Sequence, residues 1–167
     1  MAFISSSLQW CKGEIFEGRL SLLFGLCVCL LAFIYRNTGS TAFSKAMFPP
    51  FLLVGLLTSG TELGLMFTDE KRTSDYQQAS TASSSEFLAS EKPRTEGFVK
   101  WYSYTLYGLS ALMIAGLGLF LFLPTAKGRA AGLAIILWGF SKLFLDHFSE
   151  ERAHRYHART MTAIERA

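Results

Sequence analysis

Four apolar stretches, each long enough to cross a lipid bilayer, constrain the fold of this chain more than any other feature. A membrane helix needs about 20 predominantly apolar residues. The segments of that length and composition are Leu20–Tyr35, Met47–Phe67, Tyr102–Leu123 and Arg129–Phe148. Inside a bilayer the backbone must satisfy its own hydrogen bonds, so each stretch is predicted to be helical. We therefore predict an all-α membrane protein with four transmembrane helices in a compact bundle.

The composition supports this fold class. The chain has 167 residues, which fits one domain, and half of them are hydrophobic. Charged residues make up 17% of the chain, against about 25% in an average soluble domain. The net charge is only +3 and the basic residues are spread along the chain, so we expect contact with the lipid bilayer and no nucleic-acid partner.

Three polar segments flank the two pairs of spans at 20–67 and 102–148. Segment 1–19 alternates apolar and charged residues around Trp10, which is typical of an amphipathic helix at the membrane surface. An N-terminal extension of the first span explains the same pattern, and the sequence leaves both interpretations open. Segment 149–167 combines helix-forming residues with alternating charges, which predicts a helical tail.

The polar segment 68–101 is rich in Ser, Thr and charged residues and poor in apolar ones. Such a composition buries too little surface to fold alone. We predict a polar cytoplasmic loop, either a flexible linker or a segment that becomes ordered on a partner.

The distribution of Lys and Arg predicts the orientation in the membrane. With four spans, segments 1–19, 68–101 and 149–167 share one side. The basic residues on that side are Lys12, Arg19, Lys71, Arg72, Lys92, Arg94, Lys100, Arg152, Arg155, Arg159 and Arg166. Those on the other side are Arg36, Lys45, Lys127 and Arg129. The positive-inside rule therefore puts both termini in the cytoplasm.

Small residues recur at helical spacing inside three spans. Helices in lipid pack closely through such residues. The predicted packing positions are Gly60 and Gly64 in the second span, Gly108, Ala111, Ala115 and Gly118 in the third, and Gly128, Gly132 and Gly139 in the fourth.

Glu62 is a carboxylate within the second apolar stretch. A charge in a membrane helix costs roughly 2.5–3.5 kcal/mol on insertion scales, so it needs a partner or a function. The second and fourth spans run in the same direction, which places Lys142 at the depth of Glu62 and Asp146 one turn further on. We predict an intramembrane charge network of these three residues. A structural ion pair is favoured over a hydrated carboxylate or a proton- or cation-binding site.

A weaker pattern lies at the end of the fourth span. His147, Glu151 and His154 share one helix face and present metal-ligating groups. Their spacing fits no established metal motif, so solvated side chains are favoured over a metal site. The sequence contains no phosphate-binding loop and no G-x-S-x-G, and we expect neither a cofactor nor an enzyme activity.

These observations favour a small integral membrane protein that acts as a non-catalytic interaction partner. In general form it resembles the small immunity proteins of the bacterial inner membrane. The protein would work as an accessory subunit or a regulator, or, as that resemblance implies, as an immunity-type protein of the bacterial inner membrane. Its partner would be another membrane protein or a second copy of itself. The alternative is a small oligomeric transporter or channel that uses the Glu62–Lys142 pair.

Overall fold

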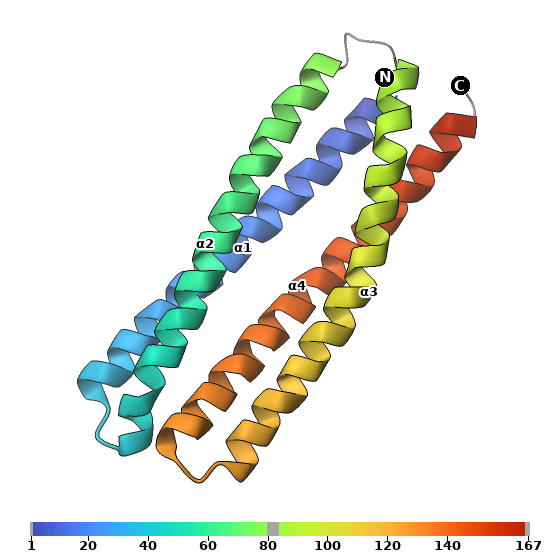
Figure 1. Ribbon diagram of the computed structural model, residues 1–167. Helices are drawn as coiled ribbons and strands as arrows, with labels where there is room; N and C mark the ends of the chain where they lie inside the picture. Colours follow the sequence, from blue (N-terminus) through green and yellow to red (C-terminus); the bar gives the residue numbers. More distant parts are fainter. Residues whose placement is uncertain (1, 80–83, 166–167) are drawn as a thin grey trace.

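The protein is a bundle of four long helices. In the computed structural model these are α1 (Ala2–Thr38), α2 (Ala42–Ala79), α3 (Ser84–Phe122) and α4 (Ala126–Glu165). The structure describes the backbone of residues 2–79 and 84–165, and the side chains of residues 7–74 and 90–165. The helices alternate in direction, so α1 starts and α4 ends at the same end of the bundle (Figure 1). We call this the terminal end, and the opposite end the turn end.

Each helix is long and apolar enough to cross a membrane, which confirms the predicted fold class. The exposed large hydrophobic side chains cover residues 16–34 of α1 and 101–122 of α3. At 1.5 Å per residue these stretches measure about 27 Å and about 32 Å, close to the thickness of a bilayer's hydrocarbon core. Toward the terminal end this apolar band stops at Phe16, Phe67, Trp101 and Phe148.

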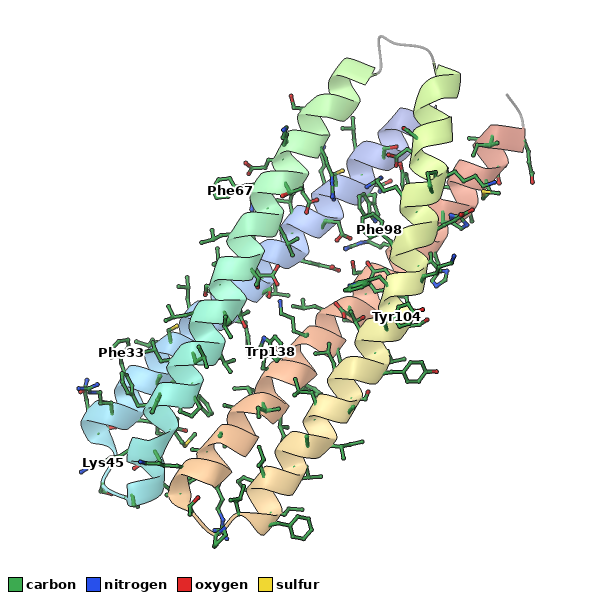
Figure 2. All side chains as sticks on the ribbon, viewed as in Figure 1. Phe33, Lys45, Phe67, Phe98, Tyr104 and Trp138 are labelled. Atoms are coloured by element: carbon green, nitrogen blue, oxygen red, sulfur yellow. The ribbon has the colours of Figure 1, made fainter. Side chains whose placement is uncertain are left out.

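The helices pack as two hairpins. α1 packs along α2 and α3 packs along α4, while α4 also contacts α1 and α2. An apolar core of α1, α2 and α4 residues joins the hairpins toward the turn end, with Phe51 and Ala134 among its buried members. In Figure 2, Trp138 lies between α2 and α4. α3 is peripheral: 6% of its most apolar window is buried, against 22–33% in the other helices.

Threonine side chains start the second helix of each hairpin. Thr41 accepts a hydrogen bond from the backbone N–H of Ser44 at 3.1 Å, and Thr125 accepts one from that of Gly128 at 3.1 Å. A hydroxyl at the N-cap satisfies an N–H that has no partner within the helix. α2 therefore begins at Ala42, earlier than the predicted Met47, and Pro49 lies inside the helix.

The prediction of a polar loop at 68–101 is wrong over the residues that the structure describes. Residues 68–79 continue α2 and residues 84–101 belong to α3. Asp69 is buried and pairs with Arg72 at 3.0 Å, while Glu91 is buried and pairs with Arg94. These pairs, three residues apart on one helix face, stabilise helix in a segment with few apolar residues.

All four helices therefore continue past the apolar band as a helical extension at the terminal end (Figure 1). Trp10 of α1 forms its core, stacked on Tyr156 of α4 with ring centroids 5.5 Å apart. The Trp10 ring also packs against Phe98 of α3 at 5.7 Å, and Figure 2 places Phe98 on the inner side of α3. Segment 1–19 is thus, as far as it is described, an extension of the first span. The predicted helical tail is confirmed up to Glu165.

Hydrogen bonds tie α1, α3 and α4 together in this extension. The Tyr156 hydroxyl donates to Glu91 at 2.8 Å and lies 2.8 Å from the Ser7 hydroxyl. Since a phenol has one proton, Ser7 is the donor in the second bond. Thr95 on α3 also lies 2.8 Å from Nδ1 of His157 on α4. The extension is therefore a packed structure of its own and not a set of solvated helix ends.

The small residues predicted to pack the helices do so on α4 but not on α2 or α3. On α4, Gly132 and Gly139 do pack: a Cβ at Gly132 would lie 2.5 Å from the backbone oxygen of Gly116 on α3, and one at Gly139 would lie 2.5 Å from Met113. A Cβ at Gly128 would meet Leu123 and Thr125, the residues of the turn before α4.

The other predicted packing positions do not meet a neighbouring helix. A Cβ at Gly60, Gly64, Gly108 or Gly118 would have no atom within 4 Å, and Ala111 and Ala115 are exposed. The prediction that these residues pack the bundle is therefore wrong within one chain. Further close approaches are made by Gly116 on α3 and, between α1 and α2, by Gly25 and Gly55.

Two glycines of α2 provide a matched test of this packing. In Gly55→Ala the new Cβ meets the Gly25 oxygen at 2.7 Å, whereas Gly60→Ala meets nothing within 4 Å. We expect Gly55→Ala to lower the free energy of unfolding by about 1–3 kcal/mol, the usual cost of overpacking. Gly60→Ala should leave it equal or higher, because alanine favours helix. Unfolding in detergent measures both, and equal effects would contradict this helix contact.

Candidate functional site

The predicted Glu62–Lys142 ion pair is present. Lys142 of α4 donates a hydrogen bond to Oε1 of Glu62 on α2, and Glu62 is 7% exposed. Glu62 lies about 7.5 Å before Phe67 along its helix, so the pair sits inside the apolar band near its terminal-end edge. Glu62 and Lys142 therefore lie at the same level of the bundle, as topology and helix rise predict.

A third helix completes the surroundings of Glu62. The Ser21 hydroxyl of α1 is 1% exposed and donates to the same Oε1 atom at 2.9 Å. A Cβ at Gly18 would lie 3.8 Å from the other carboxylate oxygen, so this helix passes close to the site. Glu62 therefore receives donors from both α1 and α4, and the three helices are held in one register.

A second ionic cluster lies at the terminal-end edge of the apolar band. Arg152 of α4 contacts Glu14 at 2.9 Å and Glu17 at 2.7 Å, both on α1. Ser149 donates to Glu14 at 2.9 Å and lies 2.8 Å from the Tyr102 hydroxyl, which links α3 to the cluster. On α4 these groups form a polar layer about two to three turns beyond Lys142.

A cavity of about 310 Å³ connects the two ionic clusters. Its lining includes the aromatic rings of Trp10 and Phe98 from the helical extension, and Leu65 and Met66 of α2. Its ionisable lining residues are Glu14, Glu17, Glu62, Asp69, Arg72, Lys142 and Asp146. Carboxylates outnumber cations in this lining, so the cavity favours water and cationic groups over anions.

The third member of the predicted network, Asp146, lines this cavity together with Lys142. Among the described residues, Lys142 forms an ion pair with Glu62 and none with Asp146. The structure thus brings the three residues into one cavity, with the direct pair between Glu62 and Lys142.

The predicted metal ligands do not gather. Among the described side chains no group of three or more His, Cys, Asp or Glu residues is placed to hold a metal ion. Glu151 pairs with Arg155, and Nε2 of His154 lies 3.7 Å from Glu150. His147 is exposed and packs against the ring of Phe148. The arrangement fits solvated side chains on the surface of α4.

The sequence did not point to Glu14, Glu17, Tyr102 or Arg152 as members of the site. The sequence did contain a signal for the three ionic residues. Glu14 and Glu17 lie just before the start of the first apolar stretch and Arg152 lies just after the end of the fourth, so the helix rise puts all three at a similar depth. The contribution of Tyr102 depends on the contact between α3 and α4, which composition does not reveal.

Comparison of the chain with protein-family models, curated proteins and solved structures finds no match. The geometry of the bundle is therefore the basis for the functional argument that follows.

The buried pair is tested by removing one charge or both. Glu62→Gln and Lys142→Met should each lower the free energy of unfolding by about 3 kcal/mol, because each leaves one buried charge without its partner. The double substitution should cost less than the sum, since no unpaired charge remains. Unfolding in detergent measures this cycle.

Glu151→Gln is the control, because it removes the exposed Glu151–Arg155 pair at the same end of the bundle. It should cost less than about 1 kcal/mol. Additive effects of Glu62→Gln and Lys142→Met would show that the two charges do not stabilise each other.

Proposed function

We propose that the protein is a non-catalytic integral membrane protein that works by binding another transmembrane segment. It would serve as an accessory subunit, a regulator or an immunity-type protein of the bacterial inner membrane, with both termini in the cytoplasm. The observation that carries this proposal is the position of α3. Its apolar span packs on α4, and only 6% of its most apolar window is buried, against 22–33% in the other three helices.

The exposed side of α3 has the composition of a helix-binding surface. Gly108, Ala111, Ala115 and Gly118 lie along one face, and Gly108 and Gly118 have open space at their Cβ positions. Small residues let a second helix approach closely in lipid, where packing replaces the hydrophobic effect as the driving force. Tyr104 is 70% exposed beside them and points away from the other helices (Figure 2).

The ionic clusters support a structural and not a catalytic role for the charged residues. Glu62 accepts hydrogen bonds from Ser21 and Lys142, and Arg152 is shared between Glu14 and Glu17. Paired groups of this kind fix helix register. They give the bundle a rigid frame on which α3 can present its exposed face.

Site-specific photocrosslinking tests the α3 surface. A benzophenone amino acid at Ala111 should give a discrete protein adduct in native membranes, and the same probe at Leu30 should not. Leu30 is 61% exposed on α1 but lies away from α3. Gly108→Leu should abolish the adduct by filling the surface, while the unfolding midpoint stays unchanged because Gly108 meets no neighbour.

The mass of the adduct separates a second copy of the 18.6 kDa chain from a different protein. A folded protein that gives no adduct from α3 would contradict the proposal.

The cavity favours a second candidate, transport of a cation. It holds an excess of carboxylates beside Glu62 and Lys142, at the edge of the apolar band. Between this cavity and the turn end, the apolar core packs α1, α2 and α4 together. A transport cycle would have to open that core, which makes this the weaker candidate.

Flux through proteoliposomes tests the second candidate. A transporter that uses Glu62 should move protons or monovalent cations at a rate that falls at least tenfold in Glu62→Gln, the order expected for loss of an essential charged group. Glu151→Gln, an exposed carboxylate of α4, is the control and should keep the full rate. Equal rates in wild type and Glu62→Gln would rule out transport through Glu62.

A further inference from the structure

α1 and α4 form a continuous seam that runs from the apolar band into the helical extension. On α4 the seam consists of residues spaced by three or four positions, which share one helix face. They are Leu137, Ser141, Phe144, Phe148, Arg152, Arg155 and Arg159. The seam is therefore apolar over its membrane part and basic beyond it.

The membrane part of the seam contains an apolar groove of about 450 Å³. Leu20, Leu23 and Cys27 line it from α1, and Leu137 and Phe144 are among the residues that line it from α4. Leu23 and Phe144 are 59% and 53% exposed, so the groove opens toward the surrounding lipid. Its apolar lining fits a hydrocarbon chain.

The outer part of the seam contains a hollow of about 140 Å³ with a basic rim. It is lined by Gln9 and Trp10 of α1, by Tyr156, and by Arg152, Arg155 and Arg159 of α4. A Cβ at Gly13 would lie 2.9 Å from Cζ of Arg152, so the missing side chain lets the guanidinium lie against α1.

Two residues that line this hollow also carry buried N–H donors that lack an acceptor among the described residues. Trp10 is 6% exposed, and its indole Nε1 has no hydrogen-bond partner. Arg152 uses Nη2 for Glu14 and Glu17, while its buried Nε also has no partner. Buried N–H groups are normally satisfied, so two of them at one hollow point to a ligand that supplies acceptor oxygens.

The depth of the hollow identifies the source of those oxygens. Arg152 and Arg155 follow Phe148 by about 6 Å and about 10 Å along α4. The headgroup layer extends roughly 5–8 Å beyond the hydrocarbon core on each side. A lipid phosphate at this level is within reach of both guanidinium groups, and Arg pairs with phosphate through two parallel N–H bonds.

We propose that the α1–α4 seam binds one anionic phospholipid of the adjacent leaflet. An acyl chain lies in the groove between Leu23 and Phe144, and the phosphate lies against Arg152 and Arg155 with Trp10 beneath it. Arg155 exchanges its exposed contact with Glu151 for the phosphate. This site lies on α1 and α4 and is independent of the partner surface proposed for α3.

Native mass spectrometry of the full chain in detergent tests this site with phosphatidylglycerol and phosphatidylcholine of identical acyl chains. We expect one retained phosphatidylglycerol and at least tenfold weaker retention of phosphatidylcholine. Arg155→Gln with Arg159→Gln should weaken phosphatidylglycerol binding about tenfold or more, the scale of a lost charge-assisted hydrogen bond. Lys12→Gln with Arg19→Gln removes the same charge from exposed positions outside the hollow and should leave binding within about twofold.

The groove is tested by Cys27→Trp, and by Leu23→Trp as a second variant should the first not fold. Both residues are exposed on the groove wall, so the added ring fills the groove without entering the core. Either variant should lose phosphatidylglycerol.

Three results would overturn the proposal. These are equal retention of the two lipids, equal losses in the two charge variants, or full retention of phosphatidylglycerol by a folded groove variant. Saturable binding of inorganic phosphate that Cys27→Trp does not affect would assign the hollow to a soluble ligand and equally overturn the lipid site.

Discussion

The joining of two helical hairpins depends on opposite charges that neither hairpin can bury alone. α4 carries Lys142 and Arg152, while α2 carries Glu62 and α1 carries Glu14 and Glu17. A single charge at this depth is costly, and attraction between opposite charges is strong where water is scarce. Docking the hairpins brings the charges together, so the ionic contacts select one register of α4 against α1 and α2 where apolar packing alone would tolerate several.

The same charges also mark a change in how the bundle is held together. Toward the turn end, contact relies on close approaches such as Gly25 with Gly55 and Gly116 with Gly132. Toward the terminal end it relies on the stacked rings of Trp10 and Tyr156 and on hydrogen bonds to Glu91. Packing of small residues is effective in lipid, whereas burial of large aromatic surface is effective next to water. The two modes meet at the ionic layer near the edge of the apolar band.

The features that composition and topology decide could be predicted from the sequence, whereas those that depend on which helix faces meet could not. The four spans follow from composition, and the Glu62–Lys142 pair follows from topology and helix rise. The helices over 68–79 and 84–101 were missed because their composition is polar and does not reveal contacts with other helices, such as that of Phe98 with Trp10 of α1. Periodicity correctly grouped Gly108 with Ala115 on one face. It could not tell that α4 would contact the neighbouring face, which contains Gly116.

The geometry of α4 keeps the two proposed surfaces apart. Gly132 and Gly139 face α3, whereas Leu137 and Phe144 line the groove with α1. At about 100° per residue, Gly139 and Phe144 lie about 140° apart around the helix axis. A lipid in the seam therefore leaves the exposed face of α3 accessible to a partner. It would also bridge α1 and α4 beside Arg152, the same two helices that the ionic cluster joins. Loss of the lipid should accordingly weaken the docking of the hairpins before it affects the contact of α3 with α4.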